Sequence, residues 1–71
     1  MQLNESLEFG YFFKTSRLER SLTQEYISYQ SGVSRSTISH LENGKGENVQ
    51  FETIIRLLAV LNMNISINQG N

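Results

Sequence analysis

The sequence predicts an all-α fold, a compact arrangement of four to five short helices followed by one short C-terminal β-strand. Three observations predict it. Apolar residues recur at helical spacing in several segments. Residues that start and end helices separate those segments. Only the last apolar residues alternate with polar ones, as in a strand. At 71 residues, the chain is long enough for one domain with a thin core, so we expect residues 1–71 to form a single domain.

The first two helices are predicted from apolar spacing and from the residues between them. Apolar side chains with mixed helical spacing predict the first helix over about 7–20. Thr23 is a suitable N-cap for a short second helix over about 24–30. Gly32 follows closely and can adopt the left-handed conformation that ends a helix, so we expect a tight turn there.

The second half of the chain is predicted to hold two more helices and the strand. Ser34 is placed to cap a third helix over about 35–42. The cleanest apolar stripe in the chain predicts a fourth helix over about 51–61, with Asn62 as its left-handed C-terminal residue. Alternating polar and apolar residues predict a strand over about 63–68.

Composition argues against several classes of protein. Without cysteine, neither a disulfide nor a thiolate metal site can form, and a single histidine, His40, argues against zinc, so we expect no metal and no cofactor. No apolar run approaches the ~18 residues of a membrane span, and the N-terminus lacks the pattern of a secretory signal, so we expect a cytoplasmic protein. Ser36 and His40 share a helix face, but they have no carboxylate partner that would complete a catalytic triad. The sequence also contains no phosphate-binding glycine loop, so we expect that the protein is not an enzyme.

Two short helices joined by a glycine-containing turn predict a helix-turn-helix unit over about 23–42. We expect four apolar side chains to face inward: Ile27, Val33, Ile38 and Leu41. This arrangement leaves four hydrogen-bonding side chains on the outer face of the third helix: Arg35, Ser36, Ser39 and His40. A small polar face suits a helix that enters the DNA major groove, although a merely solvated helix face would have the same composition. The net charge of −1 neither indicates nor excludes a nucleic-acid partner.

Three stretches resemble the lambda Cro/repressor-type helix-turn-helix proteins, also called the Xre family. They are Leu22-Thr23-Gln24-Glu25, Gly32-Val33-Ser34-Arg35-Ser36-Thr37-Ile38-Ser39 and Leu41-Glu42-Asn43-Gly44-Lys45. The resemblance covers roughly residues 9–61. It implies a four- to five-helix repressor-like fold that binds double-stranded DNA with the third helix.

The resemblance also implies roles for individual residues. Base edges would be contacted by Arg35, Ser36 and Ser39, with His40 near bases or backbone. Phosphates would be contacted by Ser34 and Thr37, and the neighbouring backbone by Asn43 and Lys45. Gln24 would contact a phosphate or help to position a base contact. For Ser34, as for Thr23, helix capping is the alternative role and the one we favour. Arg17 and Glu42 match positions that form an ion pair in phage repressors of this fold, which would tie the first helix to the third.

The chain departs from the family pattern at several positions, among them Ser16, Ser31 and Val49. Gln50 is a poor cap for the fourth helix. Tyr11 and Phe12 are difficult to bury in so small a domain, so we expect them to line a dimer or partner surface or to pack under the C-terminal segment.

The predicted C-terminal strand, with Ile65 and Ile67 on one side, cannot be stable alone. Pairing with the same strand of a second copy would give a homodimer with two recognition helices about one DNA turn apart; the alternative is a frayed tail. A repressor-type domain followed by a short strand resembles HipB-type antitoxins, and this resemblance implies a HipA-like kinase as a partner. We therefore expect a transcriptional repressor, in its narrower form the antitoxin of a toxin–antitoxin operon. The alternatives are a protein-interaction module and a stand-alone phage-type regulator without a toxin.

Overall fold

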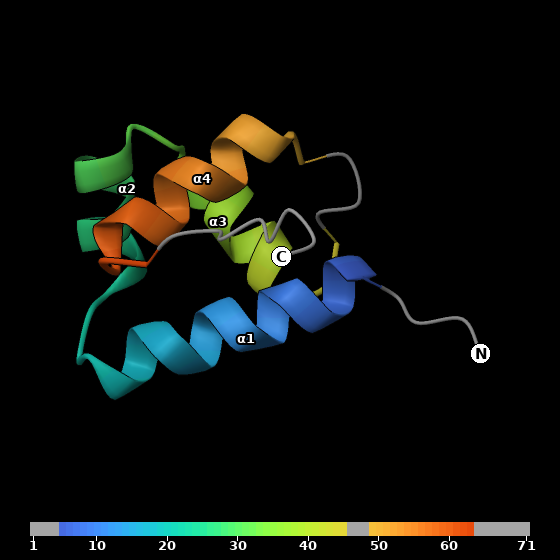
Figure 1. Cartoon of the computed structure of the whole chain (residues 1–71), viewed down its shortest axis with the longest axis horizontal. Coiled ribbons are helices and arrows are strands. Elements are labelled where there is room, and N and C mark those ends of the chain that lie inside the picture. Colours follow the sequence, from blue (N-terminus) through green and yellow to red (C-terminus); the bar gives the residue numbers. More distant parts are fainter. Residues whose placement is uncertain (1–4, 46–48, 64–71) are drawn as a thin grey trace, which may run out of the picture.

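The structure, a computed structural model, describes residues 5–45 and 49–63. These residues form four helices: α1 (Glu5–Glu19), α2 (Gln24–Ser31), α3 (Arg35–Glu42) and α4 (Phe51–Val60) (Figure 1). The all-α prediction is confirmed for them, and each predicted helix boundary lies within two residues of the observed one. The predicted strand at 63–68 lies, apart from Met63, outside the described residues.

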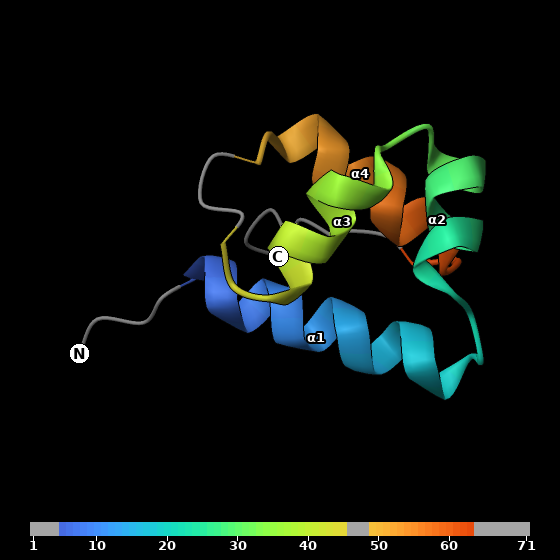
Figure 2. The ribbon, with the colours of Figure 1, turned by 180° about the vertical axis from the view of Figure 1, so that it is seen from behind.

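The four helices surround a single apolar cluster. Helix α1 packs against α3, while α2 packs against both α3 and α4. In Figure 1, α1 runs below the other three helices and α3 lies behind α4. Figure 2, seen from the opposite side, brings α3 to the front, with its C-terminal end next to α1. Helix α3 is therefore held by α1 and α2, while its Arg35, Ser36 and His40 side chains remain exposed.

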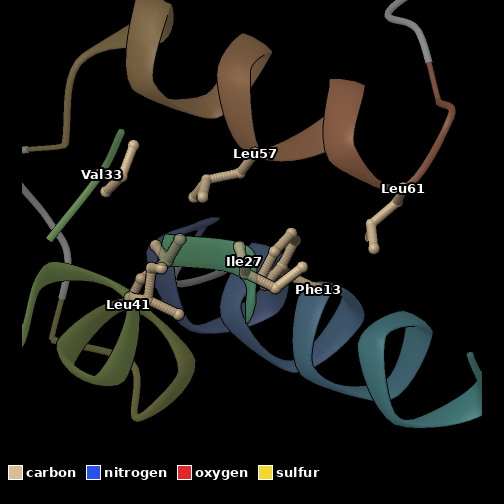
Figure 3. Packing of buried hydrophobic residues seen from close by; sticks show 7 residues of the cluster. Phe13, Ile27, Val33, Leu41, Leu57 and Leu61 are labelled. Atoms are coloured by element: carbon tan, nitrogen blue, oxygen red, sulfur yellow. The ribbon is translucent and has the colours of Figure 1, made fainter. Parts of the chain in front are cut away.

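The core is built from every helix. Its fully buried side chains are Phe13, Ile27, Ile38, Leu41, Leu57 and Leu61, and Val33 in the turn is buried beside them. Figure 3 shows Leu57 of α4 and Leu61, the residue directly after α4, on the side of that segment that faces Ile27 and Phe13. The predicted inward orientation of all four helix-turn-helix apolar residues is confirmed.

The predicted helix caps are present. The Thr23 hydroxyl oxygen accepts the Tyr26 N–H at 2.9 Å and so caps α2. Gly32 has φ 77°, a left-handed conformation, and its N–H donates to the Ser28 carbonyl to close α2. Asn62 takes the left-handed conformation (φ 60°) after α4, as expected. These local signals fix where α2, the turn and α3 begin and end.

The buried face of α1 is not its apolar face. Gly10, Ser16 and Arg17 are buried together with Phe13, whereas Tyr11 is 71% exposed and Phe12 46% exposed. Gly10 is needed because α1 approaches the end of α3 very closely there. A Cβ atom on residue 10 would overlap the carbonyl oxygen of Leu41, which is backbone and cannot move aside easily.

Arg17 and Glu42 form the ion pair that the family resemblance implies. Arg17 Nε donates to Glu42 Oε2 at 2.7 Å and Arg17 Nη2 donates to Glu42 Oε1 at 2.9 Å. The two side chains are only 8% and 1% exposed. Arg17 Nη1 also donates to the Leu22 carbonyl oxygen at 2.7 Å. One guanidinium group therefore joins α1, the connection before α2 and the last residue of α3.

Replacing Gly10 with alanine should destabilise the protein. The added methyl group would force α1 away from Leu41, and such overpacking costs about 1–3 kcal/mol, more than the roughly 1 kcal/mol that alanine gains over glycine in helix propensity. Urea unfolding followed by circular dichroism measures the difference. Glu8→Ala, at an exposed position of the same helix, is the control and should change stability by less than about 0.5 kcal/mol. Equal or greater stability of Gly10→Ala would contradict the close approach.

Removing the charge of Arg17 should lower the free energy of unfolding far more than removing that of Arg56. Arg17→Met leaves the buried Glu42 carboxylate without its counter-ion, at a cost of about 3–5 kcal/mol. Arg56 pairs with Glu52 at 3.1 Å, but both side chains are more than half exposed, so Arg56→Met should cost about 0–1 kcal/mol. Urea midpoints of the two variants test this contrast, and similar losses in both would show that burial of the pair does not matter.

Candidate nucleic-acid interface

Helix α3, the recognition helix (Arg35–Glu42), has one buried face and one polar face. Its buried residues are Ile38, Leu41 and Glu42. The predicted contact residues lie on the rest of its surface: Arg35, Ser36 and His40 are exposed, and Thr37 and Ser39 are half-buried. Every side chain outside the buried face can form hydrogen bonds, so this surface can meet base edges or phosphates.

The start of the recognition helix is closed by Ser34. Its hydroxyl oxygen accepts the Thr37 N–H at 3.1 Å, and its hydroxyl donates to Thr37 Oγ1 at 2.9 Å. Ser34 therefore acts as an N-cap, the role we favoured, and its hydroxyl proton is already engaged. Thr37 retains its own hydroxyl proton as a donor for an external acceptor.

The end of the recognition helix is closed by a Schellman motif. Gly44 has φ 77°, the Gly44 N–H donates to the Leu41 carbonyl at 3.0 Å, and the Lys45 N–H donates to the His40 carbonyl at 2.8 Å. Because the backbone is fixed by these bonds, Asn43 and Lys45 are held directly beyond the helix, both exposed. The side chains of Asn43 and Lys45 are therefore exposed next to the C-terminal end of α3.

The recognition helix exposes no negative charge. Its one carboxylate, Glu42, is 1% exposed and is paired with Arg17. Arg35 in its first turn and Lys45 just beyond its end are both cationic and exposed. A surface without exposed carboxylates between two cations suits the phosphate-lined walls of a DNA groove.

Gln24 is held inside the protein on one side. Its Nε2 donates to Glu42 Oε1 at 3.0 Å, and the residue is half-buried at the first position of α2. Sequence reasoning placed Gln24 at the interface but missed this bond, because the two residues lie far apart in the chain. The sequence does carry one indication of this contact: Gln24 is the first residue of α2 and Glu42 is the last residue of α3, so both lie at the end of the helix-turn-helix unit that is opposite its turn.

The N-terminus of α4 lacks a side-chain cap, as predicted for Gln50. The Gln50 carbonyl oxygen accepts the N–H groups of Thr53 and Ile54 at 3.0 and 3.2 Å. The Gln50 side chain accepts no hydrogen bond from the N–H groups at the first positions of α4. Such groups at a helix N-terminus can bind an anion.

Other kinds of site have no support in the described part of the chain. Among those residues, no group of three or more histidine, aspartate or glutamate side chains could hold a metal ion. No helix there is long and apolar enough to cross a membrane.

Comparison with known proteins identifies the family. Compared with curated proteins and with solved structures, the chain has no significant match. The family model HTH_3, described as helix-turn-helix, matches residues 13–68, which include the whole of α2, the turn and α3. On this match, and with the capped α2–turn–α3 geometry described above, the chain belongs to the Cro/Xre-type helix-turn-helix family of DNA-binding proteins.

Proposed function

We propose that this protein is a sequence-specific transcriptional repressor that binds a two-fold symmetric DNA operator as a homodimer. The observation that carries the proposal is the recognition helix itself: it is capped at both ends, exposes only polar or basic side chains, and has its single carboxylate buried against Arg17. An exposed carboxylate there would be repelled by phosphates, whereas a buried and neutralised one is not.

We assign recognition of the DNA sequence to the outer face of α3. The guanidinium group of Arg35 can donate two hydrogen bonds to one guanine edge, and the Ser36 and Ser39 hydroxyls can donate to or accept from neighbouring bases. His40, one turn further on, reaches bases or backbone. The residues assigned to backbone phosphates are Gln24, Thr37, Asn43 and Lys45, which surround the helix and would set its register in the groove.

Replacing Arg35 with alanine should weaken binding to the preferred duplex by about 1–3 kcal/mol and reduce sequence preference. The duplex is obtained by selection from a random library with the wild-type protein, and affinity is measured by fluorescence anisotropy. Lys14→Ala, which removes one exposed positive charge from α1, is the matched control and should change affinity little. A wild type without any salt-sensitive preference, or an Arg35→Ala variant with unchanged affinity, would favour the alternative of a protein-interaction module.

Lys45→Ala should behave differently from Arg35→Ala. A phosphate contact carries no base information, so affinity should fall to a similar extent for all sequences. The slope of log affinity against log salt should decrease in magnitude by about one. Titrations at several salt concentrations with selected and unrelated duplexes separate the two roles. Loss of sequence preference in Lys45→Ala would contradict the assignment.

Homodimerisation is proposed through Ile65 and Ile67, which lie outside the described residues. Support comes from their alternation with polar residues and from the few cations at the interface, since a second copy would double the phosphate contacts. The double variant Ile65→Asp/Ile67→Asp should sediment as a monomer and protect only one half-site in footprinting. Ser66→Asp adds a charge between them, on the other side of a strand, and should remain a dimer. An unchanged dimer in the double variant would remove this segment from the interface.

The narrower proposal is that the repressor is a HipB-like antitoxin in the cytoplasm that also binds a HipA-like kinase. It rests on the family membership and on the predicted C-terminal strand. Purification of the tagged protein from its intact operon should then recover a kinase in stoichiometric amount. Recovery of this chain alone, with operator binding intact, would favour a stand-alone regulator of the phage type.

A further inference from the structure

The buried Glu42 carboxylate receives donors from two other helices. Arg17 on α1 gives two hydrogen bonds, at 2.7 and 2.9 Å, and Gln24 on α2 gives a third at 3.0 Å. Glu42 is the last residue of α3, and Gln24 is the first residue of α2. The cluster therefore closes the helix-turn-helix unit at the end opposite its glycine turn.

The chemistry of this cluster fixes which side of the Gln24 amide faces inward. An ionised carboxylate can only accept hydrogen bonds, so the NH₂ group of Gln24, and not its carbonyl oxygen, must point at Glu42. An amide nitrogen carries two hydrogens, and Glu42 takes one of them. The second N–H stays available at the half-buried first position of α2, next to the recognition surface.

We propose that Glu42 is a positioning residue for DNA binding, which acts by holding the Gln24 amide so that its second N–H donates to a backbone phosphate oxygen. This inference rests on the proposed function. Arg17 cancels the charge of Glu42, so an approaching phosphate meets a neutral cluster and not a bare carboxylate. The anchored amide has also lost its rotamer freedom before DNA arrives, which removes an entropy cost from binding.

The test removes the anchor without leaving an unpaired buried charge. Arg17→Met/Glu42→Met replaces the ion pair with two apolar side chains, a change that proteins often tolerate without loss of stability. It is combined with Gln24→Met, which removes the amide and keeps the length of the side chain. Circular dichroism and urea unfolding establish folding, and anisotropy measures binding to the duplex selected by the wild type.

We expect Gln24→Met alone to lower affinity about tenfold, the effect of one lost hydrogen bond to a charged group. We expect the salt slope to stay nearly unchanged, in contrast to Lys45→Ala, because a neutral amide releases no counterion from the DNA. The paired variant should fold and show the same tenfold loss of affinity, and adding Gln24→Met to it should cost nothing more. A paired variant that binds like the wild type, or in which Gln24→Met still costs its full amount, overturns the inference. A wild type that binds no duplex overturns the proposed function instead.

A second measurement serves if the paired variant does not fold. The two side-chain N–H signals of Gln24 are identified in the wild-type nitrogen–proton spectrum by their loss in Gln24→Met. One should be shifted by its bond to Glu42 and exchange slowly in the free protein, and the other should move when the selected duplex is added. Two signals that both behave like those of a solvent-exposed amide would rule out the anchor.

Discussion

The buried ion pair between Arg17 and Glu42 is the constraint on which the recognition surface depends. Its atoms join the last turn of α1 to the last residue of the recognition helix, and Arg17 also donates to the Leu22 carbonyl before α2. A carboxylate moved out of water costs several kcal/mol unless donors surround it. Glu42 has three such donor contacts. The tilt of α3 is thus set by the need to keep Glu42 satisfied as well as by apolar packing.

This constraint accounts for the unusual face that α1 presents to the core. An ordinary amphipathic helix buries its apolar stripe, but α1 buries Gly10, Ser16 and Arg17 beside one aromatic residue, Phe13. Gly10 lets the backbones of α1 and α3 touch at Leu41, and Arg17, two turns later, reaches Glu42. Tyr11 and Phe12 are left exposed because the face that meets α3 is already taken by these residues.

The parts of the structure that the sequence predicts well are those determined by local signals. Thr23, Gly32 and Ser34 act within a few residues of their own positions, so the bounds of α2, the turn and α3 could be read directly. The Arg17–Glu42 pair was accessible only through the family resemblance. Neither the bond from Gln24 to Glu42 nor the need for glycine at position 10 has a local signature. The bond depends on how α2 packs against α3, and the glycine is needed because of how closely α1 approaches α3.

The same geometry explains why a net charge of −1 is a poor guide to this protein's partner. Glu42 counts as negative in the sum, yet it is buried and cancelled by Arg17. Glu52 is likewise paired with Arg56. On the recognition helix and the turn after it, the exposed formal charges are those of Arg35 and Lys45, both positive. Two cations per copy make few phosphate contacts, so salt-dependent affinity should be modest for one copy. A second copy on a symmetric site, together with neutral donors such as Gln24, would supply the affinity that net charge does not.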